Sequence, residues 1–183
     1  MTAPASTLSH PHRPLTRPAV PLLRDAADEL GKYQFQVVAG SVADAVRSIG
    51  GLIFDRAMAG WEVSVVVEGD TGADDRPLRI LGARVAKRLS DHSYALPRPH
   101  LLAVATDVMV KSDAVRRRVL AIGDDNETEV LLWGRHHPTN LNRAFVAVRH
   151  QPSAAAHVFK AQALTAGGVP AMQPADEGFY SLA

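Results

Sequence analysis

The feature that most constrains the fold is a valine-rich run, residues 61–67, that directly follows a stretch with helical periodicity. In that stretch, residues 41–60, apolar side chains recur every three or four positions, which indicates one buried helix face. Ser41 is suited to cap the start of this helix, with Asp44 three residues later to complete a capping box, and Gly60 is suited to end it. Continuous valines are typical of a central strand that is covered on both faces.

Two adjacent glycines, Gly50 and Gly51, lie in the middle of the predicted helix. Each is expected to cost roughly 1 kcal/mol relative to alanine at an interior helical position. Gly50 flanks the apolar face, so close packing of the helix on a sheet would account for it. The alternative is that the stretch breaks into two short helices at this point.

Strand and helix patterns alternate along the rest of the chain. Strands are predicted at residues 33–38, 61–67, 78–81, 101–106, 128–134 and 144–149, and helices at residues 41–60, 82–91, 112–123 and 153–166. This alternation favours a three-layer, Rossmann-like α/β sandwich with a mostly parallel sheet. The connection at residues 135–143 is shorter than the dozen or so residues that a parallel crossover usually needs. The last strand is therefore expected to be antiparallel and the sheet mixed.

The two ends of the chain lack the periodicity of the middle. Residues 1–22 are rich in proline, serine and threonine, and they cannot bury enough apolar surface to offset the entropy of ordering. They are predicted to form a flexible N-terminal arm. Residues 23–166 are predicted to form a single α/β domain, and residues 167–183 a short C-terminal tail. Within the tail, Phe179 and Tyr180 are the side chains suited to dock on the domain or on a partner.

The composition excludes several classes of site. The sequence has no cysteine, so disulfides, thiolate catalysis and zinc sites built on sulfur are excluded. Lys and Arg (20) nearly balance Asp and Glu (19), and the net charge of +1 gives no overall attraction to nucleic acid or to an anionic membrane. No apolar run approaches the roughly 20 residues that span a bilayer, and no apolar signal-peptide core is present. We therefore expect a cytoplasmic protein without a disulfide or a membrane segment, and the Ala, Val and Arg bias favours a bacterial source.

Polar residues follow four of the predicted strands. A mostly parallel sheet would bring these strand ends to one edge, where the ligands of open α/β sheets bind. The residues concerned are Gly40 and Ser41, then Glu68, Gly69 and Asp70, then Thr106 and Asp107, and finally Arg135, His136 and His137. This edge is therefore the candidate site.

The two common phosphate-binding signatures are missing from this sequence. After the first strand a dinucleotide-binding fold needs Gly-x-Gly-x-x-Gly, whereas this chain has AGSVADA, with Val42 and Ala45 in place of the second and third glycines. No Gly-Lys-Ser or Gly-Lys-Thr of a P-loop occurs either. A plain β-α-β unit with a solvated exit loop is therefore the favoured interpretation of this edge, and no cofactor is assigned.

The candidate binding residues would have distinct roles if the edge holds a ligand. The backbone amides that follow Ser41, together with the guanidinium of Arg135, would hold a small anion. Glu68 or Asp70 would hold a sugar hydroxyl or a metal ion. These four residues are the predicted ligand-binding set.

The candidate catalytic residues are His136, His137 and Asp107. A neutral imidazole can move a proton or bind a metal ion near neutral pH. Adjacent histidines on a loop point in different directions, however, and no third ligand follows at a diagnostic spacing. The alternative is a polar loop shaped by Pro138, and no metal site is predicted.

A basic segment, residues 111–118, contains Lys111 and the run from Arg116 to Arg118. Successive helical positions are about 100° apart, so these side chains form a broad basic flank instead of a focused row. A nucleic-acid surface would need interleaved aromatic side chains, and the aromatic residues, 5% of the chain, do not lie in this segment. A solvated helix face is the expected interpretation.

With no assembled catalytic signature, the sequence favours a non-catalytic α/β domain that acts through protein–protein interaction. Its role would be regulatory or accessory, and it would be a degenerate form of a nucleotide-binding scaffold. A protein partner or self-association is then expected, with a small anionic ligand as a further option. Two alternatives stay open. One is a small-molecule or nucleotide-binding enzyme with its site at the carboxyl ends of the strands, and the other is a nucleic-acid-associated accessory protein that uses residues 111–118.

Overall fold

The structure is a computed structural model that describes residues 32–69, 72, 74–86, 98–123, 127–135, 144–171 and 174–182. The described helices are α2 (Val42–Met58), α3 (Arg76–Ile80), α4 (Thr106–Lys111), α5 (Asp113–Gly123) and α6 (Ala154–Ala166). The described strands are β1 (Gln34–Ala39), β2 (Glu62–Val67), β3 (Arg84–Ala86), β4 (Leu101–Ala105), β5 (Glu129–Trp133), β6 (Phe145–His150) and β7 (Glu177–Leu182). The predicted N-terminal arm, residues 1–22, lies outside the described residues.

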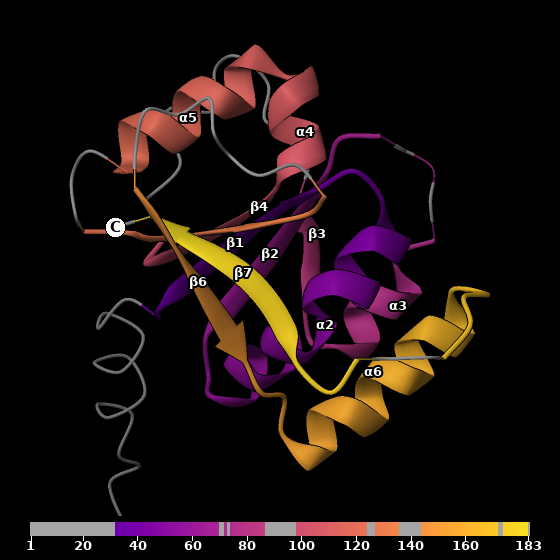
Figure 1. Cartoon of the computed structure of the whole chain (residues 1–183). Coiled ribbons are helices and arrows are strands. Elements are labelled where there is room, and N and C mark those ends of the chain that lie inside the picture. Colours follow the sequence, from indigo (N-terminus) through magenta and orange to yellow (C-terminus); the bar gives the residue numbers. More distant parts are fainter. Residues whose placement is uncertain are drawn as a thin grey trace, which may run out of the picture. The chain divides into compact units, whose positions relative to one another are not determined.

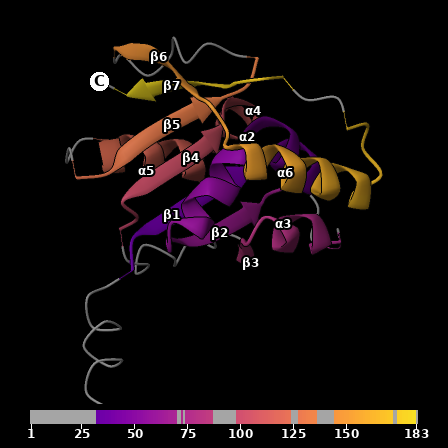
Figure 2. The ribbon, with the colours of Figure 1, turned by 90° about the horizontal axis from the view of Figure 1, so that it is seen from below.

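The strands form one mixed sheet in the order β3-β2-β1-β4-β5-β7-β6. The five strands β3, β2, β1, β4 and β5 are parallel, and β7 runs antiparallel to both of its neighbours. Helices α2, α3 and α6 contact one another, as do α4 and α5. Figures 1 and 2 show these two groups of helices on opposite faces of the sheet. The predicted three-layer, Rossmann-like α/β sandwich is confirmed.

The core lies in the centre of the sheet, where helices cover both faces. Every residue of β4 is buried, and in β1 the side chains of Phe35 and Val37 have no exposed surface. Helix α2 contributes its predicted face, on which Ile49 and Ile53 are also fully buried. Full burial of one such side chain stabilises the fold by about 1.5–3 kcal/mol relative to exposure. The apolar runs that predicted central strands therefore do form the central strands.

Helix α2 begins as the sequence predicts. The hydroxyl oxygen of Ser41 accepts a hydrogen bond from the amide of Asp44 (3.1 Å), which satisfies one of the free amides at the start of the helix. The Asp44 carboxylate accepts a hydrogen bond from the Ser48 hydroxyl (3.1 Å). Asp44 thus braces the first turn along the helix, and among the described residues its carboxylate makes no return bond to the amide of Ser41.

Helix α2 is continuous through Gly50 and Gly51, so the alternative of two short helices is wrong. An added Cβ at Gly51 would lie 2.6 Å from Cγ of Pro152, and an added Cβ at Gly50 would lie 3.3 Å from Cγ of Lys160. Gly51 is therefore required by the close approach of the residues that lead into α6, whereas Gly50 lies in tight contact with flexible side chains. Close packing does account for Gly50, but against Leu81 and against Lys160 of α6, and not on the sheet as the sequence analysis expected.

A buried ion pair joins α2, α6 and β7 at the same place. Lys160 Nζ of α6 lies 2.5 Å from Glu177 Oε1 of β7, and neither side chain is more than 1% exposed. The Glu177 carboxylate also accepts hydrogen bonds from the amides of Gly51 (2.7 Å) and Leu52 (2.9 Å) in the middle of α2. The missing side chain of Gly51 is what allows this carboxylate to reach the helix backbone.

Replacement of Gly51 by alanine is expected to lower the free energy of unfolding, although alanine is the better helix former by about 1 kcal/mol. The new methyl group would overlap Pro152, whose ring has little freedom to move, and overpacking of this kind costs about 1–3 kcal/mol. Urea denaturation of G51A and of G50A, where the nearest atoms are side-chain carbons at 3.2 and 3.3 Å, checks the expectation. A G51A protein more stable than G50A would contradict it.

The segment after β2 folds in the opposite order from the prediction. We predicted a strand at residues 78–81 and a helix at residues 82–91, whereas α3 ends at Ile80 and β3 lies at residues 84–86. Pro77 has a favoured position in the first turn of a helix, and Gly82, with a φ of 80°, follows its end. Periodicity does not distinguish a short helix from a short strand, and β3 is stabilised by its pairing with β2.

The predicted C-terminal tail contains strand β7, which lies between β5 and β6 (Figure 1). We predicted that the strand at residues 144–149 is antiparallel, but β6 runs in the same direction as β5, and β7 is the antiparallel strand. The length of the connection at residues 135–143 misled the prediction because it assumed that β5 and β6 are neighbours. Phe179 is buried, as docking on the domain requires.

A second polar cluster ties the last turn of α2 to the start of α6. The Asp55 carboxylate accepts hydrogen bonds from the Ser153 hydroxyl at Oδ1 (2.6 Å) and from the Ser153 amide at Oδ2 (3.1 Å), and His150 Nε2 lies 2.9 Å from the same Oδ2. Burial opposes ionisation, but the hydrogen bonds from Ser153 and the contact with His150 outweigh it and hold the pKa of Asp55 below its usual value of 3.8. The ionised carboxylate is therefore part of the folded state.

Replacement of Asp55 by asparagine is expected to lower the free energy of unfolding at pH 7. This loss is expected to become progressively smaller as the pH falls. A carboxyl whose pKa is lower in the folded chain stabilises the fold above its unfolded pKa, and this contribution is lost as the pH falls through its folded pKa. Urea denaturation of wild type and D55N between pH 7 and pH 2 measures the difference. The exposed Asp113, which pairs with Arg116 at 2.8 Å, supplies the control variant D113N, for which a small effect is expected. If the difference in the free energy of unfolding between wild type and D55N does not become smaller in acid, this account is contradicted.

None of the helices in the described part of the chain is long and apolar enough to cross a membrane.

Candidate functional site

The four strand ends predicted to meet do lie at one edge of the sheet. Ala39 pairs with Val67, and Ala105 pairs with Trp133, as the last registered pairs of their strands. The pairing of β1 with β4 continues the same register across the centre of the sheet. One step beyond these pairs, the chain leaves the sheet at the residues Gly40, Glu68, Thr106 and Gly134. We call these four residues the exit row.

The order in which the chain adds strands to the sheet reverses between β1 and β4, in the middle of the exit row. The chain connects β1 to β2 on one side and passes from β3 to β4 on the other, so the sheet grows away from the β1–β4 pair in both directions. Ligands of open α/β sheets bind in the crevice at such a switch point. Gly40 and Thr106 are the row members that follow β1 and β4, and they flank this crevice.

Two glycines bring backbone segments unusually close together at the exit row. An added Cβ at Gly69 would lie in contact with the carbonyl oxygen of Gly40, and an added Cβ at Gly134 would overlap the hydroxyl of Thr106. Gly134 also has a φ of 129°, a backbone conformation that L side chains rarely adopt. These positions therefore need glycine so that the ends of β1, β2, β4 and β5 can crowd together.

Two buried polar atoms beside the exit row have no hydrogen-bond partner among the residues that the structure describes. They are the hydroxyl oxygen of Thr106 and the indole nitrogen Nε1 of Trp133, on residues that are 2% and 3% exposed. An unsatisfied buried donor or acceptor costs about 1–3 kcal/mol, and native proteins usually match such a group with an ordered water or a ligand. Both atoms come from adjacent strand ends at the predicted site.

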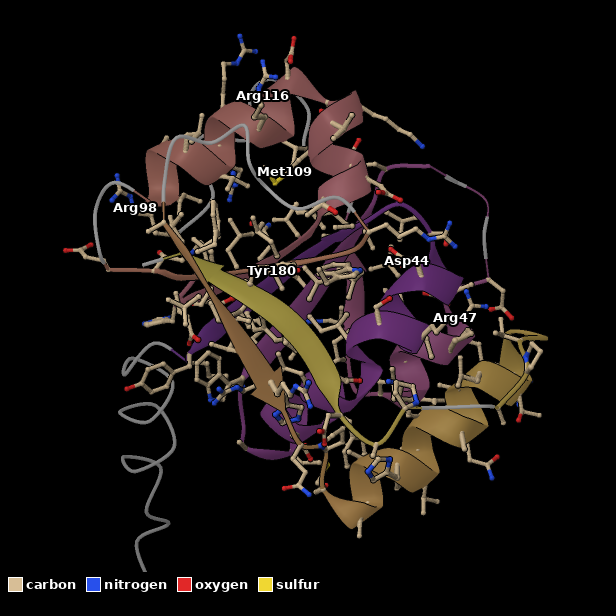
Figure 3. The ribbon with its side chains drawn as sticks, viewed as in Figure 1. Asp44, Arg47, Arg98, Met109, Arg116 and Tyr180 are labelled. Atoms are coloured by element: carbon tan, nitrogen blue, oxygen red, sulfur yellow. The ribbon has the colours of Figure 1, made fainter. Side chains whose placement is uncertain are left out.

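A pocket of about 290 Å³ opens next to the exit row. It lies among the first turns of α2, the start of α3 and the end of α6. Its apolar walls include Val42, Ala43 and Val46 of α2, Pro77 of α3, and Leu164, Ala166 and Val169 at the end of α6. Ser41 and Asp74 are its polar lining residues. Figure 3 shows Asp44 on the first turn of α2, the helix that links this pocket to the exit row.

The predicted site residues that the structure describes lie at or next to the exit row, but they differ in exposure. Ser41, Glu68 and Arg135 lie at the exit row or next to it, and Asp107 follows Thr106 directly. Asp107 and Arg135 are exposed, and Ser41 and Glu68 are partly buried.

Three predicted residues lie outside the described part of the chain. These are Asp70, His136 and His137, which include both histidines that we considered for proton transfer. Among the residues that the structure does describe, no three His, Cys, Asp or Glu side chains are grouped so that they could hold a metal ion.

The predicted basic helix is divided between α4 and α5, and its arginines do not act together. Arg116 pairs with Asp113 (2.8 Å), and Figure 3 shows it on the side of α5 that faces away from the sheet. Arg118 instead donates a hydrogen bond to the buried Gln36 of β1 (2.8 Å). One of the three arginines is therefore a structural contact between α5 and the sheet.

An aromatic cluster occupies the opposite edge of the sheet, where β1, β2 and β4 begin. Tyr33 stacks on Trp61 with ring centroids 5.0 Å apart and lies 4.7 Å from the ring of His100. Arg56 lies over the Trp61 ring at 4.7 Å. Trp61 is only partly buried in this surface cluster, whereas Trp133 is buried.

Sequence reasoning missed the features that make the edge distinctive. Thr106 was treated as one of several polar strand ends, and Trp133 only as part of the strand predicted at residues 128–134. The walls that α6 contributes to the pocket were not foreseen. The small residues Ala163, Ala166 and Gly167 recur at helical spacing at the end of α6, and that spacing is the available signal of a close approach.

Comparisons with known proteins find similar folds among solved structures. No family model matches the chain, and no curated protein matches its sequence. Among solved structures, the A40926 pseudoaglycone deacetylase is similar with a TM-score of 0.58 and 14% identity, over 83% of this chain and 98% of that one. A triple mutant of a deacetylase from the teicoplanin biosynthetic pathway has a TM-score of 0.53 and 15% identity, over 82% and 98%. The 4-carboxy-2-hydroxymuconate hydratase of Pseudomonas putida has a TM-score of 0.51 and 15% identity, over 81% and 95%.

These similarities correct the principal functional prediction. At this level of identity they show the fold alone, and the proteins of similar fold include two deacetylases and a hydratase. The prediction of a non-catalytic, regulatory domain that acts through protein–protein interaction is therefore contradicted. The prediction was wrong because it relied on missing sequence signatures, and a catalytic edge can be assembled without any of them. The enzyme alternative, with its site at the carboxyl ends of the strands, fits better.

Proposed function

We propose that the chain is an enzyme that acts on a small organic molecule at the exit row, by a reaction that adds water to the substrate. Removal of an acetyl group by hydrolysis and hydration are both reactions of this kind, and both are represented among the proteins of similar fold. The proposed class is therefore hydrolysis of a small amide or ester, or hydration of a carbon–carbon double bond.

The observation that carries the proposal is the buried hydroxyl of Thr106 at the switch point of the sheet, which has no hydrogen-bond partner in the described part of the chain. An unsatisfied buried hydroxyl does not stabilise the fold, whereas in a binding site it supplies a hydrogen-bonding group, and this one lies close to Gly134. The indole N–H of Trp133 is a donor only, and it stands at the last position of the neighbouring strand. Together they support a role in holding a substrate oxygen.

In the hydrolytic case, each part of the exit row has a chemical role. The Thr106 hydroxyl, the Trp133 N–H and the Arg135 guanidinium would donate hydrogen bonds to the acyl oxygen, on which negative charge develops. The carboxylate of Glu68 or Asp107 would accept a proton from water as the water oxygen bonds to the acyl carbon. The bond from that carbon to nitrogen or oxygen then breaks, and the leaving group takes up the proton. The products are a carboxylic acid and an amine or alcohol.

Replacement of Thr106 by valine is expected to leave the fold as stable as wild type or to stabilise it, and to lower the catalytic rate. Valine keeps the shape of threonine but removes the hydroxyl that has no partner, and removal of such a group is neutral or favourable for folding. Loss of one donor to a developing oxyanion costs about 10²–10³ in kcat. Acetate release from small N-acetyl and O-acetyl compounds, and loss of absorbance from conjugated alkenes, measure the rate, and urea denaturation measures stability.

Thr128 supplies the matched control. It is also a buried threonine, but its hydroxyl donates a hydrogen bond to the carbonyl oxygen of Pro99 (2.7 Å). T128V is therefore expected to lose about 1–3 kcal/mol of stability because it leaves that carbonyl without its donor, and to keep its activity per folded molecule. A wild-type protein that turns over no compound of either class, or a T106V protein as active as wild type, would reject the proposed function.

A further inference from the structure

The pocket beside the exit row has a composition that selects for one kind of chemical group. Its walls are aliphatic, and among the described residues that line it there is no Lys, Arg or His. The charged side chain in the lining is Asp74, and one of its oxygens accepts a hydrogen bond from the amide of Arg76 (2.9 Å). An anionic ligand would meet a carboxylate and no cation, so the pocket favours a neutral group.

The polar side of the pocket can bind an amide or an alcohol. The hydroxyl oxygen of Ser41 accepts a hydrogen bond from Asp44, which leaves the hydroxyl proton for donation. The carboxylate of Asp74 accepts hydrogen bonds only. A neutral amide has both a carbonyl oxygen for Ser41 and an N–H for Asp74, and an alcohol can likewise donate and accept.

The volume sets the length of the apolar part. A water-sized group takes about 30 Å³ of liquid volume, so about 290 Å³ accommodates roughly ten such groups. This lies at the small end of the range for ligand pockets. An aliphatic chain of about six carbons with a neutral polar head fills the space.

We propose that this pocket binds the short aliphatic part of a neutral, amide- or alcohol-bearing molecule, and that it is the apolar subsite of the enzyme. The role of the pocket as a subsite rests on the proposed function, because Ser41 connects the pocket to the exit row. The pocket then explains why the end of α6 is built from small residues. Ala166 leaves room in the wall, and a larger side chain there would fill the space that the ligand needs.

Binding of linear primary amides, measured by isothermal titration calorimetry on the full chain, tests the proposal. Affinity is expected to rise about fourfold for each added CH₂ from butanamide to hexanamide, and to stop rising by dodecanamide. Hexanoate is expected to bind at least tenfold more weakly than hexanamide, because it carries a negative charge beside Asp74. The D74N variant should narrow this difference by strengthening the binding of hexanoate.

Ala166→Phe and Ala155→Phe are the matched variants on α6. Ala166 lines the pocket, whereas Ala155 is exposed on the first turn of the helix and is not among the lining residues. A166F is expected to bind hexanamide at least tenfold more weakly than wild type, and A155F to bind it equally well. Equal binding by A166F and A155F, or tighter binding of hexanoate than of hexanamide, would overturn the proposal.

The T106V variant separates this inference from the proposed function. It changes the exit row and not the pocket, so hexanamide should bind to T106V as it does to wild type. If the protein turns over a substrate in a way that depends on Thr106 but binds no aliphatic amide, the subsite proposal is rejected and the proposed function stands. If wild type binds hexanamide and A166F does not, but wild type turns over no substrate, the proposed function is rejected and ligand binding in the pocket stands.

Discussion

Replacement of Glu177 by alanine is expected to lower the free energy of unfolding by about 3–5 kcal/mol, the cost of leaving one charge of a buried pair without its partner. Lys160 is 1% exposed and has its ammonium group 2.5 Å from the Glu177 carboxylate. The amides of Gly51 and Leu52 would lose their acceptor at the same time. The loss should appear as a lower urea midpoint with an unchanged slope.

Two further variants locate the origin of this effect. K160M/E177Q removes both charges, so it should recover part of the stability that E177A loses. E129A removes an exposed carboxylate from β5 and should have a small effect. An E177A protein within 1 kcal/mol of wild type would contradict the claim that this pair holds α2, α6 and β7 together, since about 3 kcal/mol is the lower end of the expected loss.

Replacement of Gly134 by alanine is expected to have the second-largest effect, about 2–5 kcal/mol, because two costs add. The φ of 129° is strained for any L side chain, and the new methyl group would overlap the Thr106 hydroxyl. The same displacement would move that hydroxyl within the exit row. We therefore expect G134A to lose activity beyond its loss of folded protein, which activity per folded molecule measures.

Gly60 separates the two costs of the Gly134 substitution. It has a φ of 86°, and nothing lies within 4 Å of an added Cβ, so G60A pays for the backbone conformation alone. The double variant T106A/G134A removes the hydroxyl in the way of the methyl group and should regain part of the lost stability. If G134A is no less stable than G60A, the close contact between position 134 and the Thr106 hydroxyl does not contribute to the cost.

The sequence predicts the central architecture well because burial of apolar side chains decides it. The valine run of β2 and the helical stripe of α2 have one arrangement that buries both, and the structure adopts it. The segment from α3 to β3 was predicted wrongly because its apolar runs are too short for periodicity to identify. Strand β7 was missed because only pairing with β5 and β6 makes a strand of residues 177–182.

The location of the candidate site was predictable, but its distinctive features were not. Parallel strands bring Ser41, Glu68, Asp107 and Arg135 to one edge, and that conclusion needs only the order of strands and helices. That the Thr106 hydroxyl has no partner depends instead on which atoms surround it in three dimensions. The pocket likewise depends on how α6 packs on α2 and α3, which lie far from it in the sequence.

The proposed location of the active site at the exit row is tested most directly by NMR, which maps where a small amide binds along the backbone. N-butylacetamide, which carries an acetyl group and an alkyl chain, is titrated into the ¹⁵N-labelled full chain, and changes in amide chemical shift are recorded. The account predicts that the largest changes fall on Gly40, Ser41, Gly69, Thr106 and Gly134. The largest changes at Tyr33, Trp61 and His100, at the opposite edge of the sheet, would contradict it.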